Sequence, residues 1–365
     1  MNYIKQLDAI RAFAIIFVLI AHWGSSNLNK ILPFGNIGVD VFFVLSGFLI
    51  TRILLFEKEK IQENNTRKAK LSVISKFMVR RSLRIFPIYY FMLLILYFGC
   101  DYWLFNPIPK DWEYYVLYLQ NILFYNNQSL PGGNVGHFWT LAVEEQFYLF
   151  WPWVLIYINK KYIKHVLVLG IIIGTLSTLF LPLIPEKEKL SSILTICCLH
   201  AFCIGGLISY LSLKKDQVLE KNYFSIKFFG VIAIFIFLWL KTFYSHIISL
   251  DRLLIAIISF WIITAILLNK TEKLNFIFNN KILILIGRFS YGIYVYHNFI
   301  PVTLNGLLHI SKKKFIESSE IWIGLDFLQN NVFSFNVLCL TVLLGIAYFS
   351  FQFIETPFLR LKKYF

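Results

Sequence analysis

Long apolar runs separated by short polar or charged stretches fill nearly the whole chain. A membrane-spanning helix takes about 20 mostly apolar residues, because hydrocarbon cannot satisfy free backbone amides and carbonyls. The runs therefore predict an all-α, polytopic integral membrane protein, a bundle of about ten transmembrane helices. The predicted spans lie near residues 6–24, 37–56, 82–100, 137–158, 165–184, 191–212, 226–245, 252–268, 282–301 and 332–354.

Two connections between the predicted spans are longer than the others. The segment 101–136 is rich in Trp, Tyr, Asn, Pro and Gly and is predicted to be a partly folded interfacial loop, and 302–331 is predicted to be a second such loop. No small-residue cleavage site follows the first apolar run, so we predict a retained span rather than a signal peptide. No internal repeat is visible, and a single membrane-embedded domain over 1–365 is the simplest organisation.

The composition agrees with lipid as the main solvent. Of the 365 residues, 58% are hydrophobic and 15% are charged, against roughly 45–50% and about 25% in ordinary soluble domains. These proportions exclude a soluble globular enzyme and an intrinsically disordered chain.

The net charge of +15 is distributed unevenly along the chain. With the N-terminus inside, 22 Lys and Arg residues fall in the connections on that side and nine fall on the other side, Arg252 among the nine. Cytoplasmic loops carry such an excess, so both termini are predicted to be cytoplasmic. Topology and anionic lipid then account for the positive charge, and no nucleic-acid partner is expected.

Metal and disulfide chemistry find no support in the pattern of cysteines. The five cysteines are scattered, mostly within apolar runs, and form no Cys-x-x-Cys pair and no His/Cys ligand spacing. The sequence therefore predicts neither a disulfide framework nor a metal site.

Ionisable side chains inside membrane spans are costly, so each one is a candidate functional residue. In the first span, Arg11 and His22 are eleven residues apart, which is close to three helical turns and places both on one face about 16 Å apart along the axis. The alternative interpretation is an interfacial histidine and an arginine that extends to the headgroups.

The second and fourth spans carry carboxylates at the depth predicted for His22. Asp40 could hold the His22 imidazole in one tautomer, or it could simply be a first-turn acid favoured by the helix dipole. Glu144 and Glu145 are adjacent, so one of them is expected to face a polar interior and the other to find a different partner. Gly38 and Gly47 of the second span are predicted to permit close helix approach.

The ninth span brings Tyr294 and His297 to the same outer half of the membrane. Together with His22, Asp40 and the Glu144–Glu145 pair, these residues predict one polar pocket formed by four helices. Ser46 and Trp139 are further candidates for its lining, and Trp139 or Tyr294 could stabilise an oxyanion.

The cytoplasmic side carries a different kind of candidate. Arg81 and Arg84 lie at i, i+3 on one face before the third span. Arginine offers a rigid fork of donors that suits phosphate. The alternative is that the two residues only anchor the helix to lipid headgroups.

Taken in order, these motifs resemble the membrane-bound acyltransferase-3 family. The resemblance runs from residue 7 to residue 357 and is carried by Leu7-Asp8-Ala-Ile-Arg11 with His22, Gly38-Val-Asp40-Val-Phe-Phe-Val-Leu-Ser46-Gly47-Phe48, Arg81-Ser-Leu-Arg84, Trp139-Thr-Leu-Ala-Val-Glu144-Glu145-Gln146-Phe147-Tyr148, Ser290-Tyr291-Gly292-Ile-Tyr294 with His297, and Glu355-Thr-Pro357.

The resemblance implies an enzyme that moves an acyl group, usually acetyl, from acyl-CoA to hydroxyls of a surface polysaccharide such as lipopolysaccharide, capsule or peptidoglycan. Arg11 and His22 fall on the family's Arg-x10-His pair, and Arg81 and Arg84 on its Arg-x-x-Arg motif, which the family ties to catalysis and to the donor. The expected donor substrate is acyl-CoA, and no metal is expected. We expect His22 to act as general base or acyl carrier, oriented by Asp40 or by one of the two glutamates.

The same resemblance suggests where the protein works and with which partners. Abundant Ile, Lys and Asn indicate an AT-rich, bacterial genome, so the expected location is the bacterial inner membrane. Many relatives carry an esterase-like domain after the last helices, which this sequence does not contain. If a second-stage soluble transferase is needed, we expect it to be a separate protein.

Two other classes of function remain possible from the sequence alone. A polysaccharide exporter could use the same polar pocket as a translocation path, although we find no repeated halves and no matched pair of broken spans. A helical anchor for a glycan assembly complex would leave the buried charges unexplained.

Overall fold

The computed structural model describes residues 3–24, 28, 31–61, 66–98, 111–131, 135–214, 217–243, 248–314 and 331–365. Within these ranges the chain is helical and contains no strand, which confirms the all-α class. Eight of the described helical segments are long and apolar enough to cross a membrane, so the prediction of a polytopic membrane protein is confirmed. They are α1 (Gln6–Trp23), α3 (Phe34–Lys60), α4 (Arg67–Phe98), Lys160–Leu183 around α8 (Ile163–Phe180), α9 (Thr195–Ser212), α11 (Tyr223–Phe243), Leu250–Leu267 within α12 (Ile248–Leu267), and Val332–Tyr364, which begins with α17 (Val332–Ser350).

The remaining two predicted spans also form helices. One is α7 (Trp139–Tyr157), whose apolar character is reduced by Glu144 and Glu145. The other is α14 (Lys281–Tyr296), which is only 16 residues long because the helix breaks at 297–298 before α15 (Phe299–Lys314) begins. Every predicted span therefore corresponds to a helix.

The two predicted long loops had different outcomes. The described part of 101–136 holds two short helices, α5 (Trp112–Val116) and α6 (Gln120–Asn127), as expected for a partly folded segment. The prediction of a loop from 302 was wrong, because 302–314 continues α15. That stretch has a helical apolar pattern which its lysines obscured. The rest of both segments, 101–110, 132–134 and 315–330, lies outside the described residues.

The chain folds into two compact units, each assembled from separate stretches of sequence. Unit 1 comprises Met1–Val79, Gln120–Ser129 and Trp139–Arg288, and unit 2 comprises Arg80–Leu119, Leu130–Phe138 and Phe289–Phe365. The single membrane domain over 1–365 stays a prediction.

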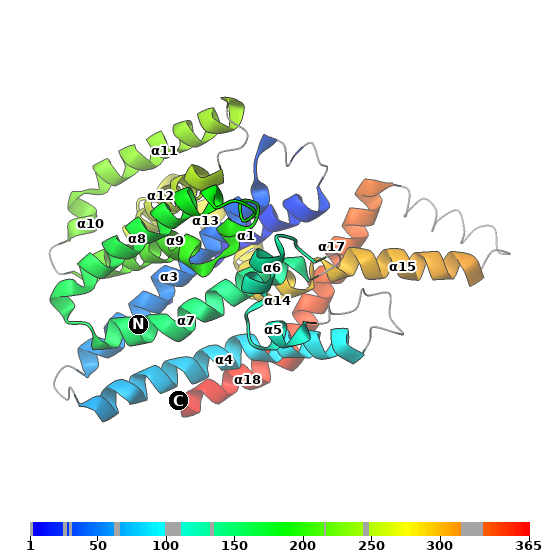
Figure 1. Ribbon diagram of the computed structural model, residues 1–365, viewed down its shortest axis with the longest axis horizontal. Coiled ribbons are helices and arrows are strands. Elements are labelled where there is room, and N and C mark those ends of the chain that lie inside the picture. Colours follow the sequence, from blue (N-terminus) through cyan, green and yellow to red (C-terminus); the bar gives the residue numbers. More distant parts are fainter. Residues whose placement is uncertain are drawn as a thin grey trace. The chain divides into compact units, whose positions relative to one another are not determined.

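Helix α3 is the centre of unit 1. It packs against α1, α7, α9 and α12, while α8 packs on α9 and α11 packs on α12 (Figure 1). Glycines make the closest of these contacts possible, as predicted for Gly38 and Gly47. A Cβ at Gly47 would lie 2.0 Å from the carbonyl oxygen of Phe202 in α9, and a Cβ at Gly38 would lie 2.4 Å from that of Ala14 in α1.

A buried lysine joins α3 to the end of α7 in the same unit. The Lys58 amine donates to the carbonyl oxygens of Leu155 at 2.6 Å and Ile156 at 3.3 Å, and also to that of Ile158. The last carbonyls of a helix have no partner within the helix, so the amine satisfies groups that lipid could not.

Unit 2 is built around aromatic side chains. Tyr89 of α4 stacks on Tyr118 with ring centroids 4.3 Å apart, and its hydroxyl donates to the Tyr115 carbonyl oxygen at 2.7 Å. In another part of the unit, Phe289 of α14 contacts Tyr348 and Phe351, on α17 and the helical turn that follows it.

Candidate functional site

Helix α1 of unit 1 carries both residues of the predicted Arg11–His22 pair. His22 lies in the last turn of the helix, and Arg11 lies near its start, where other charged residues adjoin it. His22 is exposed. Arg11 lies 3.6 Å from the carboxylate of Asp8, measured from Nη1 to Oδ1, and Asp8 is also 3.9 Å from Arg288. Asp8 was not predicted as a site residue, although its spacing of three residues before Arg11 signals an ion pair on one helix face.

The Asp40 carboxylate is bound by Arg252. In the sequence, this arginine was counted only among the nine basic residues on the outer side. The Nε atom of Arg252 donates to both carboxylate oxygens of Asp40, at 2.9 and 3.2 Å, and Nη2 donates to Oδ1 at 2.8 Å. Asp40 is 0% exposed and Arg252 is 3% exposed. Among the residues that the structure describes, the hydrogen bonds and ion pairs of the Asp40 carboxylate are all to Arg252 rather than to His22.

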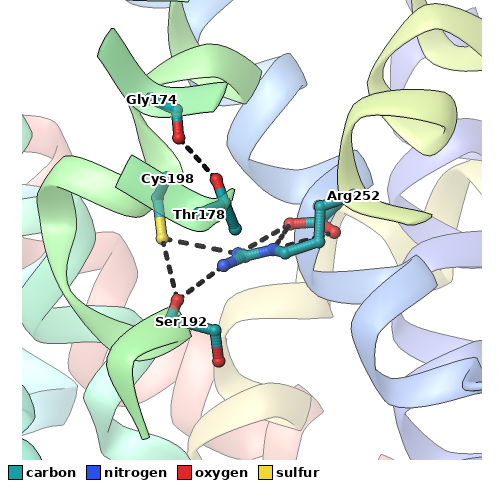
Figure 2. A network of polar contacts seen from close by, with 6 residues as sticks. Gly174, Thr178, Ser192, Cys198 and Arg252 are labelled. Atoms are coloured by element: carbon teal, nitrogen blue, oxygen red, sulfur yellow. Dashed lines mark hydrogen bonds and ion pairs between the residues drawn. The ribbon is translucent and has the colours of Figure 1, made fainter. Parts of the chain in front are cut away.

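The Arg252 guanidinium also has partners other than Asp40. Figure 2 shows its side chain reaching toward the segment that carries Ser192 and Cys198. Its Nη1 donates to the Ser192 carbonyl oxygen at 2.6 Å, and its Nη2 lies 3.4 Å from the Cys198 sulfur. One guanidinium thus connects α12 with α3, with α9 and with the turn before α9.

A second buried ion pair adjoins the first. Lys241 of α11 pairs with Asp251 of α12, and both side chains are nearly inaccessible to solvent. Successive residues of α12 therefore neutralise charges on two different neighbouring helices.

The structure distinguishes the two adjacent glutamates of α7. The Ser46 hydroxyl donates to Glu144 Oε1 at 2.9 Å, and the Tyr148 hydroxyl donates to the Ser46 oxygen at 3.1 Å. Glu144 therefore meets α3 through Ser46, which is another predicted pocket residue. Trp139, at the start of α7, packs edge-on against Phe43 of α3 with ring centroids 6.2 Å apart.

Unit 2 contains a pair of imidazoles, only one of which was predicted. The ring centroids of His137 and His297 are 4.6 Å apart. The Nε2 atom of His137 lies 3.3 Å from the Val295 carbonyl oxygen, and the Asn298 amide donates to His137 Nδ1 at 2.9 Å. His297 Nδ1 lies 2.6 Å from the Tyr294 carbonyl oxygen, and the Tyr294 hydroxyl donates to the His137 carbonyl oxygen at 3.1 Å.

These contacts fix which nitrogen of each neutral ring carries hydrogen. A carbonyl oxygen can only accept, so His137 carries its hydrogen on Nε2 and His297 carries its hydrogen on Nδ1. The lone pair of neutral His297 is then on Nε2, the position at which that ring can take a proton.

The helix break explains why the imidazoles gather at this point. The last carbonyls of α14 have no partner within the helix, and in an apolar environment each must find a donor. The two rings supply such donors to Tyr294 and Val295. His137 precedes α7 by two residues, directly before the Trp139 motif, and that adjacency was the only sequence signal for its role.

The predicted donor residues Arg81 and Arg84 are half-buried on α4 in unit 2. Glu355, which is 2% exposed, experiences the charge of Arg84, and Lys362 experiences the charges of both arginines. A carboxylate and a third cation from the end of the chain therefore share this region. The surplus positive charge suits a phosphate group or a lipid headgroup equally well.

The predicted site residues fall into two sets according to unit. Arg11, His22, Asp40, Ser46, Trp139, Glu144 and Glu145 belong to unit 1, and Arg81, Arg84, Tyr294 and His297 belong to unit 2. Within the described ranges, no three His, Cys, Asp or Glu side chains are grouped so that they could hold a metal ion.

A comparison with known proteins shows the family to which this chain belongs. The sequence profile of an acyltransferase domain matches residues 4–350. The chain belongs to this acyltransferase family. The resemblance drawn from the ordered motifs is thereby confirmed. No solved structure matches the chain.

Three relatives are similar to nearly the whole chain. It is 29% identical over 379 residues to the peptidoglycan O-acetyltransferase OatA of Listeria monocytogenes, covering 98% of this chain and 56% of the relative. It is 27% identical to a putative O-acetyltransferase and 26% identical to the O-acetyltransferase OatA, both of Staphylococcus aureus, covering 98% of this chain and 58% and 57% of those relatives. The chain therefore spans little more than half the length of these relatives.

Proposed function

We propose that this chain is a membrane-bound O-acyltransferase that moves an acetyl group from acetyl-CoA to a hydroxyl of a cell-wall polysaccharide. The observation that carries the proposal is the family match over residues 4–350, together with relatives that are all named O-acetyltransferases. A peptidoglycan-type acceptor is favoured over lipopolysaccharide, because one relative is named for peptidoglycan. The proposed location is the bacterial plasma membrane.

In the proposed reaction His22 is the general base. Its exposed position at the end of α1 leaves the imidazole within reach of an acceptor. The imidazole takes the proton of the acceptor hydroxyl while the oxygen attacks the thioester carbonyl carbon, and the carbon–sulfur bond then breaks. The proton finally passes to the departing thiolate, so atoms and charge balance.

The donor is proposed to bind through its phosphates. Arg81 and Arg84 present paired guanidinium forks on one face of α4, and Lys362 adds a point charge. Bidentate contacts from arginine strengthen the binding of a phosphate group and also fix its orientation. The carboxylate of Glu355 is proposed to keep Arg84 extended until the donor arrives.

The test is transfer of radiolabelled acetyl from acetyl-CoA to soluble peptidoglycan fragments by purified protein in detergent. We expect transfer by the unmodified protein and a fall of at least about a hundredfold for His22→Ala, because a positioned base contributes roughly 10²–10⁴. Label that binds to the unmodified protein before acceptor is added, and does not bind to His22→Ala, would instead identify His22 as an acyl carrier. A His22→Ala protein that transfers at the normal rate contradicts the assignment of the base, and an unmodified protein that never transfers leaves a transport function as the better reading.

The donor site has its own test in the same assay. Arg81→Gln together with Arg84→Gln is expected to raise the KM for acetyl-CoA at least tenfold with a smaller change in kcat, because ground-state phosphate contacts are lost. Arg67→Gln, near the exposed start of α4, is the matched control and should change neither constant. An unchanged KM in the double variant would show that the two arginines are lipid anchors.

A further inference from the structure

Both oxygens of the Asp40 carboxylate accept from the arginine that faces it. Arg252 occupies both carboxylate oxygens, and neither residue is accessible to solvent. The contacts of this carboxylate are therefore to a guanidinium rather than to an imidazole. The structure thus gives Asp40 a partner other than the His22 that was predicted from the sequence.

The Asp40–Arg252 pair lies close to the contact between α3 and α1, the helix that carries His22. Gly38 is two residues before Asp40 on α3 and sits directly against Ala14 and Val18 of α1. His22 follows Val18 by four residues, about one helical turn. Arg252 therefore holds α3 at the level where Ala14 and Val18 of α1 pack on it, four to eight residues before His22.

Arg252 is suited to fix that surface because it contacts more than one element. Besides Asp40 on α3, its guanidinium reaches the Ser192 carbonyl oxygen and Cys198 (Figure 2). The planar fork imposes both distance and direction on the groups it joins. A displaced guanidinium would leave a buried carboxylate without a counter-charge.

Resting on the proposed function, we infer that Asp40 and Arg252 are positioning residues. Their ion pair fixes α3 under the end of α1 and thereby sets the place of His22, while Asp40 itself touches no substrate. Arg252 is accordingly a functional residue for acyl transfer, although it takes no part in the chemistry.

Pair variants distinguish this role from a catalytic one. Breaking a buried pair leaves an uncompensated charge and is strongly destabilising, whereas replacing both partners by neutral groups of similar volume is often tolerated. A catalytic carboxylate, by contrast, cannot be rescued by changing Arg252.

The experiment measures kcat, KM and thermal midpoint for Asp40→Asn, Arg252→Gln and their combination, each per folded protein. Each single variant is expected to lose at least tenfold in kcat and to melt earlier, and the double variant is expected to return to within about threefold of the unmodified kcat. A second combination, Asp40→Leu with Arg252→Met, repeats the test with apolar partners.

The adjacent ion pair supplies a matched control. Lys241→Gln breaks a buried pair of the same kind between α11 and α12, so it should lower the thermal midpoint and leave kcat within about twofold. Equal losses of kcat for Lys241→Gln and Arg252→Gln would overturn the proposal, because the effect would then be general destabilisation.

A readout that needs no acyl transfer keeps this inference separate from the proposed function. The rate at which diethyl pyrocarbonate modifies His22, followed by mass spectrometry, should change at least threefold in both single variants and return in a double variant. Two outcomes overturn the inference. One is an unchanged rate of His22 modification in the single variants, and the other is a kcat in the double variants as low as that of Asp40→Asn. Failure of the unmodified protein to transfer acetyl, with the His22 pattern as expected, overturns only the proposed function.

Discussion

At the scale of single residues, the contacts of the polar groups say more about their roles than their positions along the chain. His137 and His297 carry their hydrogens on different ring nitrogens, because each donates to a different carbonyl oxygen near the end of α14. His137 also accepts from Asn298, so both of its nitrogens are engaged. Its role is therefore to hold the helix break in place, together with His297, which donates from Nδ1 to the Tyr294 carbonyl oxygen.

His137 offers a residue-scale prediction about stability. His137→Ala removes the donor to Val295 and leaves a buried carbonyl oxygen unpaired, which is expected to cost about 1–3 kcal/mol of unfolding free energy. His137→Gln keeps an N–H donor at the position of Nε2 and should recover at least half of the loss. Thermal melting of the detergent-solubilised protein measures both, and equal midpoints for the Ala variant and the unmodified protein would contradict the capping role.

At the scale of elements, glycine sets how closely the helices of unit 1 approach. On α3 and α9 the contact is reciprocal, since a Cβ at Gly47 would lie 2.0 Å from the Phe202 carbonyl oxygen and a Cβ at Gly205 would lie 2.0 Å from that of Val44. In lipid there is no hydrophobic driving force between helices, so close van der Waals packing of this kind contributes much of the association. Asp40 and Ser46 both lie on α3, whose position this contact helps to fix.

The element-scale prediction compares two glycines. Gly47→Ala should lower the thermal midpoint and the yield of folded protein, because its methyl group meets backbone on α9 that cannot move aside cheaply. Gly345→Ala on α17 is the matched control, since a Cβ there has nothing within 4 Å. Alanine is favoured over glycine in a helix by about 0.8–1.0 kcal/mol, so this control should be neutral or slightly stabilising. A Gly47→Ala protein as stable as the control would show that the helices can separate without loss.

At the scale of the whole molecule, the distribution of positive charge predicts how the chain is oriented in the membrane. The 22 Lys and Arg residues on one side against nine on the other favour that side as cytoplasmic. Lys161 and Lys189 are both exposed and lie on either side of α8 in the chain. One of them is therefore expected inside the cell and the other outside.

Labelling of intact cells tests this orientation. A membrane-impermeant maleimide should react with Lys189→Cys and not with Lys161→Cys, and permeabilised cells should label both. The parent chain gives the background from its own cysteines, the described ones of which are buried. Labelling of Lys161→Cys in intact cells would reverse the proposed topology.

The sequence by itself determined the membrane class, the place of all ten predicted helices, the close-packing glycines at 38 and 47, and the family. These properties depend on short stretches of sequence. The length of an apolar run decides whether one helix can span the membrane, and a small residue decides how closely one neighbouring helix can approach. The sequence also placed His22 and Glu144 on their helices, but it did not predict the break at His297 and could not say which groups these residues meet.

Only the tertiary structure decided the partners. Asp40 and Arg252 are 212 positions apart, and His137 and Asn298 are 161 apart, so no local pattern joins them. A buried charge must be compensated by some group, but which group does so depends on how the helices pack. The choice of Glu144 over Glu145 as the partner of Ser46, and the break that ends α14 among imidazoles, follow from the same packing.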